Sequence, residues 1–162
     1  LDFSKPVWIE GESRKVGDAL IPHRLREAMR SATCVLATAP MASRVQRIVD
    51  EYGAPDETTR IQLGEALRSL TRFVGAAQVE ALAPLVAAGN FAPVVRELLG
   101  GHYDPRYDHA MRDYRYLRTV DSTNLESATK ELHAIWQKLA DSPADATASR
   151  PVLETVLVEK MA

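Results

Sequence analysis

Apolar and polar residues follow two different patterns in the first third of the chain. Short runs of β-forming residues, over 7–9 and 33–38, predict buried strands. Apolar residues spaced three and four apart predict helices over 22–29 and 43–52. An order of strand, helix, strand, helix favours parallel strands joined by crossover helices. The expected fold class is therefore α/β, with a parallel sheet of few strands.

After Gly53 the pattern becomes helical. Asp56 is placed to cap a helix over 57–73. Gly75, Pro84 and Gly89 are expected to divide the next stretch into two shorter helices. Further helices are predicted over 91–99, ended by Gly100 and Gly101, and from Asp121 onward with one apolar stripe of Leu125, Ala128, Leu132, Ile135, Trp136 and Leu139.

The remaining segments are less regular. Residues 102–109 combine polar and aromatic side chains around a proline, which predicts a turn where something binds. An edge strand is predicted over 114–120, a flexible linker over 142–150, and a short apolar helix or strand over 152–161 that docks on a neighbour. The predicted organisation is an α/β part over 1–53, a helical region over 54–141, and a linker with a C-terminal segment over 142–162.

Composition is that of an ordinary soluble domain, with 46% hydrophobic and 26% charged residues in 162. The net charge of -2 excludes a globally basic surface, so any contact with nucleic acid must come from a local patch. Basic residues do gather early in the chain, either as such a patch or as a solvated face: Arg14, Lys15, Arg24, Arg26, Arg30, Arg44 and Arg47.

Cys34 is the one cysteine, so no intrachain disulfide can form and a reducing compartment is expected. It lies in an apolar run, where a thiol serves as a small buried hydrophobe rather than a nucleophile. The sequence shows no apolar run long enough to span a membrane and no signal peptide, so we expect a cytoplasmic protein without a membrane partner. The start at Leu1, just before a strand, suggests that preceding sequence is absent.

The first strand is followed at once by Glu10, Gly11, Glu12, Ser13 and Arg14. Two carboxylates at the carboxyl end of a parallel strand lie where α/β sheets bind ligands. Gly11 permits the bend that brings both acids to one side, and Arg14 offers a planar fork for phosphate or carboxylate. The alternative is a surface turn with solvated charges.

Other chemistry is poorly supported by the sequence. No phosphate-binding loop of the form G-x-x-x-x-G-K-[ST] occurs, so a self-sufficient nucleotide hydrolase is not expected. His102, Asp104, Asp108 and His109 include metal-capable side chains but lack a metal-ligand spacing, and polar residues around a turn usually form hydrogen bonds within it. No metal site is therefore predicted.

Several segments resemble, in the same order, the C-terminal half of bacterial tRNA 2-selenouridine synthase. The resemblance covers about residues 3–110 and rests on residues 7–17, Ile21-Pro22, residues 39–52 and Tyr103-Asp104-Pro105-Arg106-Tyr107. The segments are individually short but together, at this separation, fairly specific. The resemblance implies a partial P-loop-like parallel sheet followed by a mostly helical C-terminal region.

The resemblance also implies an activity. Members join a rhodanese-like domain, which carries the catalytic cysteine, to a P-loop-type α/β domain. They convert 2-thiouridine at the tRNA wobble position to 2-selenouridine through an S-geranylated intermediate, with geranyl diphosphate and selenophosphate as substrates and no certain cofactor. This chain lacks the rhodanese domain and the phosphate loop, so those parts are expected in cis or in trans. Alone it is not expected to catalyse the reaction, and no catalytic residue is assigned.

Charged residues receive candidate substrate-binding roles from this resemblance. Glu10 and Glu12 would hold an ordered or metal-bound water, or orient a cationic side chain. Arg14, with Arg44 or Arg47, would neutralise oxygens of a diphosphate or of the backbone at the tRNA anticodon region.

Tyr103 and Tyr107 would stack on a base or pack on the prenyl chain. Each role has an alternative, because the arginines could instead pair with Glu10, Glu12 or Asp50 and the tyrosines could anchor a half-buried turn. The full candidate set is Glu10, Glu12, Ser13, Arg14, Arg44, Arg47, Tyr103, Asp104 and Tyr107.

Two other functions are consistent with the same sequence. A non-catalytic helical adaptor would keep the scaffold and bind a protein partner. A P-loop-type kinase fragment is suggested by the strand, proline and arginine-rich helix over 33–49, although it would lack the phosphate loop. An incomplete sheet would expose core surface, which favours a homo-oligomer.

Overall fold

The computed structural model describes residues 7–11, 15–16, 18–53, 55–112, 114–141 and 154–157. The chain forms two compact units. One, the sheet unit, takes residues 1–39 and 111–161, and the other, the helical unit, takes residues 40–110. These boundaries differ from the predicted division at residues 53 and 141. The helical unit is an insertion into the sheet unit, since the chain leaves the sheet before residue 40 and returns after residue 110.

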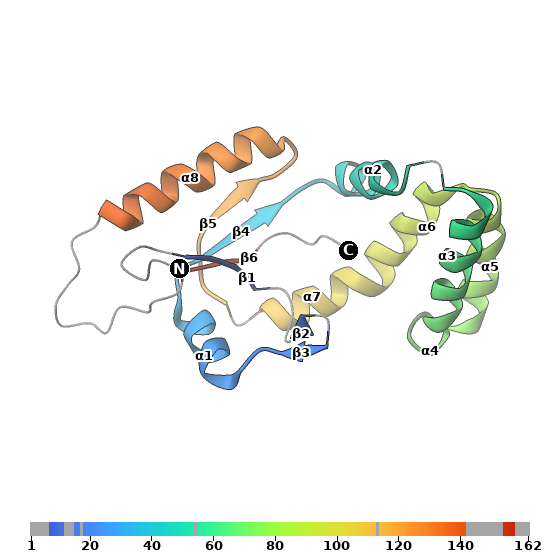
Figure 1. The fold of residues 1–162 in the computed structure, drawn as a ribbon, viewed down its shortest axis with the longest axis horizontal. Coiled ribbons are helices and arrows are strands. Elements are labelled where there is room, and N and C mark those ends of the chain that lie inside the picture. Colours follow the sequence, from blue (N-terminus) through green and yellow to red (C-terminus); the bar gives the residue numbers. More distant parts are fainter. Residues whose placement is uncertain are drawn as a thin grey trace. The chain divides into compact units, whose positions relative to one another are not determined.

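The sheet unit is built on a four-stranded sheet within the described residues. Its strands are β1 (Trp8–Glu10), β4 (Cys34–Thr38), β5 (Tyr116–Asp121) and β6 (Glu154–Leu157), in the order β1-β6-β4-β5. Each neighbouring pair is parallel. Figure 1 shows β4 and β5 side by side, with Thr38 opposite Asp121 in the register. The predicted α/β class with a partial P-loop-like parallel sheet is confirmed. A small antiparallel pair, β2 (Lys15–Val16) and β3 (Ala19–Leu20), forms a second sheet.

Two helices connect the strands of the parallel sheet. Helix α1 (His23–Ser31) leads from β1 towards β4, and α8 (Leu125–Asp141) leads from β5 back to β6. The two connections cross the sheet in opposite directions, as in doubly wound sheets. Helix α8 buries Ala128 and Ile135 against Val35 and Val120, both of which have no exposed surface. This apolar stripe was predicted, except that Leu125, at the first position of the helix, is 56% exposed.

The strands were predicted at the right positions, but the first strand is less buried than predicted. The strand predicted over 33–38 is β4, and the edge strand predicted over 114–120 is β5, which ends the described sheet. The first strand is parallel, as expected, but Trp8 and Ile9 are only half-buried because β1 lies at the other edge. The apolar segment expected over 152–161 supplies β6, between β1 and β4.

The start of α8 was predicted too early. Asp121 is the last residue of β5, and its carboxylate accepts hydrogen bonds from the backbone N–H and the hydroxyl of Thr123. The helix is capped instead by Asn124, whose side-chain oxygen accepts the N–H of Ser127.

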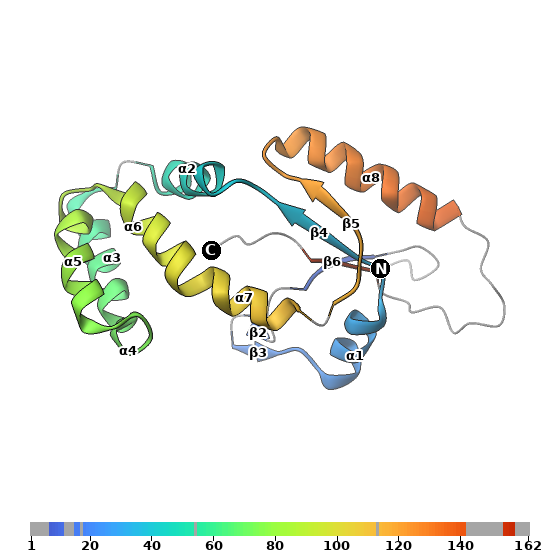
Figure 2. The same cartoon turned by 180° about the vertical axis from the view of Figure 1, so that it is seen from behind.

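The helical unit follows β4. Figure 2 shows its helices, which are α2 (Met41–Tyr52), α3 (Glu57–Ser69), α4 (Thr71–Val74), α5 (Ala76–Ala87), α6 (Phe91–Leu98) and α7 (Asp104–Met111). A π-helical turn, η1 (Leu99–Tyr103), joins α6 to α7. The last residue of α7 belongs to the sheet unit. The largest core cluster of the helical unit is Leu67, Val79, Leu82, Val86 and Val94. The predicted cap of α3 is confirmed, since the carboxylate of Asp56 accepts the N–H of Thr59.

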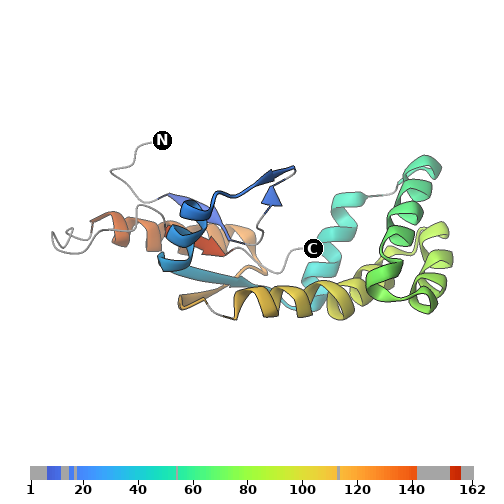
Figure 3. The ribbon, with the colours of Figure 1, turned by 90° about the horizontal axis from the view of Figure 1, so that it is seen from below.

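Two predicted helix ends were wrong. Pro84 was expected to break a helix but lies inside α5, where Val79, Leu82 and Val86 pack into the core and hold the backbone helical. Gly100 and Gly101 were expected to end a helix, yet the chain continues through η1 into α7 (Figure 3). The predicted turn over 102–109 is therefore helical.

Tertiary packing explains this continuation. Leu99 has no exposed surface and packs with Val45 and Ile48 of α2, and His102 is also buried. Pro105 is the second residue of α7, directly after the π-helical turn, and has no N–H to donate to that turn. Buried contacts on both sides of the glycines thus outweigh their low helix propensity.

Leu99→Ala is expected to lower the free energy of unfolding by about 2–5 kcal/mol, because it opens a cavity at a fully buried position. Ile61→Ala is the matched control, because Ile61 is 56% exposed on α3 and its truncation should change stability by less than about 0.5 kcal/mol. Urea denaturation measures both. Equal effects of the two substitutions would contradict the described core.

Candidate functional site

The acidic turn predicted after the first strand is only partly described. Glu10 is the last residue of β1 and is exposed. Glu12, Ser13 and Arg14 lie outside the described residues, so their predicted roles stay predictions. Because the strands are parallel, their carboxyl ends lie along the same side of the sheet. Glu10 of β1, Thr38 of β4 and Asp121 of β5 are the last residues of their strands on that side.

At the carboxyl ends of the strands, residues 121–123 form a hydrogen-bonded polar turn that the sequence did not single out for function. The Ser122 hydroxyl donates to the carbonyl of Thr38 at 3.1 Å, and Ser122 is buried. Hydrogen bonds from the side chain and the N–H of Thr123 lower the pKa of Asp121. The carboxylate of Asp121 therefore favours its charged form and is held by its own turn. Within the described part of the chain, no three His, Cys, Asp or Glu side chains gather as a metal site.

Cys34 has the environment of a structural thiol. It is buried in β4, its Sγ lies 3.4 Å from the carbonyl oxygen of Ala32, and burial raises its pKa. A raised pKa keeps the thiol protonated, and the thiolate is the nucleophilic form. The interpretation of Cys34 as a small buried hydrophobe agrees with this geometry.

In the helical unit, two predicted site residues meet each other. Arg44 of α2 and Asp104 of α7 are sixty positions apart and form a bidentate ion pair, with Nη1–Oδ2 at 3.0 Å and Nη2–Oδ1 at 2.7 Å. Arg44 is only 5% exposed. The sequence placed both residues in the candidate set but did not foresee that they bind each other. The pair fixes the first residue of α7 against α2.

Arg47 and Tyr107 lie one turn further along the same two helices and are half-buried. Tyr103 immediately precedes Asp104 and belongs to η1. The structure therefore gathers five of the predicted residues on α2, η1 and α7: Arg44, Arg47, Tyr103, Asp104 and Tyr107.

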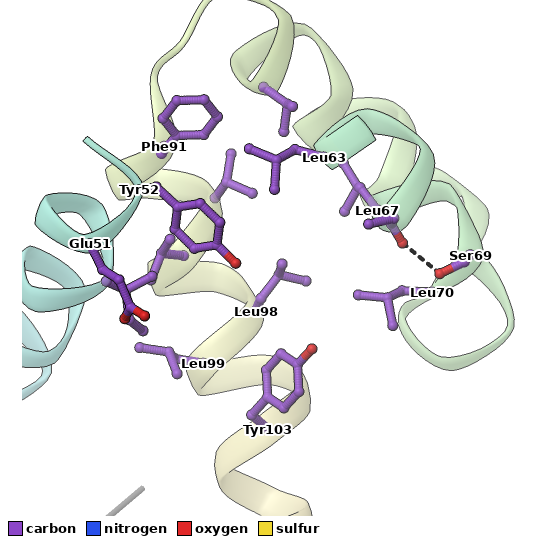
Figure 4. A pocket seen from close by; sticks show the side chains of 15 residues that line it. Glu51, Tyr52, Leu63, Leu67, Ser69, Leu70, Phe91, Leu98, Leu99 and Tyr103 are labelled. Carbon is purple, nitrogen blue, oxygen red and sulfur yellow. Dashed lines mark hydrogen bonds between the residues drawn. The ribbon is translucent and has the colours of Figure 1, made fainter. Parts of the chain in front are cut away.

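Tyr103 also lines an apolar cavity of about 460 Å³ within the helical unit. Figure 4 shows the rings of Tyr52 and Tyr103 facing the side chains of Leu63 and Leu67 on α3 and of Leu70, which follows that helix. The cavity walls come from α2, α3, α5, α6 and η1, and are Ile48, Glu51, Tyr52, Leu63, Ala66, Leu67, Ser69, Leu70, Val86, Phe91, Val94, Val95, Leu98, Leu99 and Tyr103. Few polar groups interrupt these walls, so the cavity suits an apolar ligand chain.

The sequence did not reveal this cavity. Periodicity identified the apolar face of α3 but could not show that the facing helices leave space instead of filling it. The only signal was Tyr103, which was predicted to pack on a prenyl chain or a base.

A second feature lies beside Tyr103. His102 is buried, its ring meets that of Tyr103 edge to face at 4.9 Å between centroids, and it lies 5.6 Å from the ring of Phe73. The guanidinium carbons of Arg72 and Arg106 lie 4.5 and 5.3 Å from the Phe73 ring centroid. We call Arg72, Phe73 and Arg106 the Arg–Phe–Arg cluster. Burial, with a smaller effect from Arg106, lowers the pKa of His102.

The fold defines the class of the protein: an α/β domain with a parallel sheet, consistent with a partial P-loop-like fold, that carries a helical insertion between β4 and β5. The family model for the tRNA 2-selenouridine synthase AAA domain matches residues 2–139. The chain therefore belongs to the tRNA 2-selenouridine synthase AAA domain family, and the resemblance noted in the sequence is confirmed. Comparisons with curated proteins and with solved structures each found no match. Among the described helices, none is long and apolar enough to cross a membrane.

Arg44→Met is expected to lower the free energy of unfolding by about 3–5 kcal/mol, because it removes the guanidinium that pairs with the partly buried carboxylate of Asp104. The double variant Arg44→Met/Asp104→Leu should recover much of that loss, since it removes both charges. Arg118→Met, which breaks an exposed pair with Glu131, serves as the control and should cost less than about 1 kcal/mol. A double variant no more stable than Arg44→Met would show that the charge pair is not the cause.

The lowered pKa of His102 predicts a pH dependence of stability. Since the unfolded state has the ordinary, higher pKa, it binds a proton first as the pH falls, and folding stability contributed by neutral His102 is lost below pH 6.5. His102→Phe keeps an aromatic ring and should flatten the fall in unfolding free energy between pH 7 and 5. His109→Gln, an exposed histidine on α7, is the matched control. An unchanged slope in His102→Phe would refute the assignment.

Proposed function

We propose that this chain is a substrate-binding part of a tRNA 2-selenouridine synthase and that the cavity of the helical unit receives the geranyl group used by this enzyme. The reaction replaces the sulfur of 2-thiouridine at the tRNA wobble position by selenium, through an S-geranylated intermediate. The observation that carries the proposal is the apolar cavity of about 460 Å³ lined by Tyr103. Burial of a prenyl chain there would contribute about 0.8 kcal/mol per CH₂ group.

The predicted residues around the cavity acquire different roles in this proposal. Arg44 is engaged with Asp104, so we assign the pair to positioning Tyr103 rather than to direct binding of diphosphate. Tyr103 contacts the prenyl chain. Arg14 and Arg47 remain our candidates for contact with diphosphate or tRNA backbone, and Glu10, Glu12 and Ser13 for the polar edge of the sheet.

The chain contributes binding and not the nucleophile. Cys34 is buried and its pKa is raised, which is the opposite of what a reactive thiol needs. The printed sequence contains no phosphate-binding loop. We propose that a rhodanese-like and phosphate-loop portion supplies both, in cis or in trans, that selenophosphate is the selenium donor, and that the reaction takes place in the bacterial cytoplasm on the tRNA anticodon region.

The alternative of a helical adaptor is favoured by one observation. Leu117 is 62% exposed on β5, an edge strand of the described sheet. An exposed apolar edge strand can bind a partner protein, just as it can pair with a further strand of a larger sheet.

Ala66→Trp tests the cavity. Ala66 lines it from α3, so the indole should fill the space and weaken binding of geranyl diphosphate at least about tenfold, while inorganic diphosphate binding stays unchanged. Ala81→Trp is the matched control, because Ala81 is exposed on α5 and is not part of the cavity wall. Isothermal titration calorimetry measures both ligands.

A shorter prenyl diphosphate tests the cavity without any substitution in the protein. Dimethylallyl diphosphate should bind the unsubstituted chain more weakly than geranyl diphosphate, since it buries fewer carbons. Equal affinity for geranyl diphosphate and inorganic diphosphate would contradict the proposal. Indifference to every diphosphate and to tRNA would favour the adaptor.

A further inference from the structure

The Arg–Phe–Arg cluster has a composition that the cavity does not explain. Phe73 is 48% exposed at the end of the helical pair α3 and α4 and is not part of the cavity wall. Arg72 and Arg106, from α4 and α7, are both exposed and both lie within cation–π distance of the same ring. A half-exposed aromatic ring and two cations that lie over it are thus presented together on the surface of the helical unit.

Positive charge at this cluster is not neutralised within the described residues. Neither Arg72 nor Arg106 forms an ion pair with a carboxylate there, whereas Asp104, two positions before Arg106, is engaged by Arg44. Two guanidinium groups that share one ring repel each other, so an anionic ligand between or beside them would be stabilised. The cluster stands out because the chain as a whole is slightly acidic, with a net charge of -2.

The Phe73 ring of the cluster packs against the π-helical turn η1. The Phe73 ring contacts His102, which is buried and meets Tyr103 edge to face. Both residues belong to the π-helical turn η1, and such turns are rare and frequently occur at functional sites. The ring of Phe73 therefore packs on a buried residue of this turn.

We infer that the Arg–Phe–Arg cluster is a stacking site for an unpaired base of the tRNA, with Arg72 and Arg106 contacting the phosphates on either side of that base. This inference rests on the proposed function, which makes tRNA the partner. Loop bases of RNA are recognised by stacking on aromatic rings or guanidinium planes, and arginines pair with the backbone. A small diphosphate would need only the cations. The half-exposed ring beside these cations favours a ligand that has a flat apolar face as well as negative charge.

Binding of an anticodon stem-loop RNA, measured by fluorescence anisotropy at several salt concentrations, tests the inference. Phe73→Leu keeps an apolar side chain but removes the aromatic face, and should weaken binding by about five- to 150-fold. Phe73→Trp should retain it. Circular dichroism checks that each variant is folded.

The two cations are tested separately. Arg72→Gln/Arg106→Gln should reduce the slope of log K against log salt concentration by about 1.4, the value expected for two lost phosphate contacts on a single strand. Arg96→Gln/Arg115→Gln removes the same charge from two exposed arginines, one on α6 and one just before β5, and is the matched control. It should leave the slope within the error of the unsubstituted chain.

An RNA with abasic sites in the loop separates stacking from simple attraction between charges. If stacking occurs, Phe73→Leu and the unsubstituted chain should bind the abasic RNA equally. If Phe73→Leu binds the intact stem-loop as well as the unsubstituted chain does, or the control pair changes the slope as much as the cluster pair, the inference is overturned and the cluster is a structural or general anion contact. If the unsubstituted chain binds geranyl diphosphate but no tRNA or stem-loop, the inference fails while the proposed role of the cavity stands. If it binds neither ligand, both fail.

Discussion

The bidentate pair of Arg44 and Asp104 is the interaction on which the helical unit depends. Two charges that are largely withheld from water must satisfy each other, because an unpaired buried charge costs far more than a lost surface contact. The pair connects the fourth residue of α2 with the first residue of α7, which are the first and last helices of the insertion. Tyr103 directly precedes Asp104, so the position of one wall of the cavity follows from this ion pair.

Much of the fold could be predicted because each element carries its own local signal. The strands at 34–38 and 116–121 and the stripe of α8 are visible as periodicity, and Asp56 is a typical helix cap. Helix ends were wrongly predicted at Pro84 and Gly100 because buried neighbours override local propensity there. Periodicity also cannot tell which strand of a parallel sheet is central, so the place of β6 required the structure.

The candidate site shows the same limit. Sequence resemblance marked Arg44 and Asp104, yet only the structure shows that they bind each other. The cavity and the Arg–Phe–Arg cluster depend on side chains from segments far apart in sequence, such as Arg72 and Arg106. The two features meet at η1 and differ in chemistry. Tyr103 is part of the apolar wall of the cavity, and the neighbouring His102 contacts both Tyr103 and Phe73 of the Arg–Phe–Arg cluster.

The strand order also constrains how the protein can be synthesised. Strand β6 lies between β1 and β4, although it is the last described element of the chain. During translation β1 and β4 must wait for their common neighbour until residue 157 has left the ribosome, whereas the helical insertion is a compact unit within residues 40–110 and can fold earlier. A truncation that removes only β6 would therefore divide the sheet through its centre and leave two unpaired strand edges prone to aggregation.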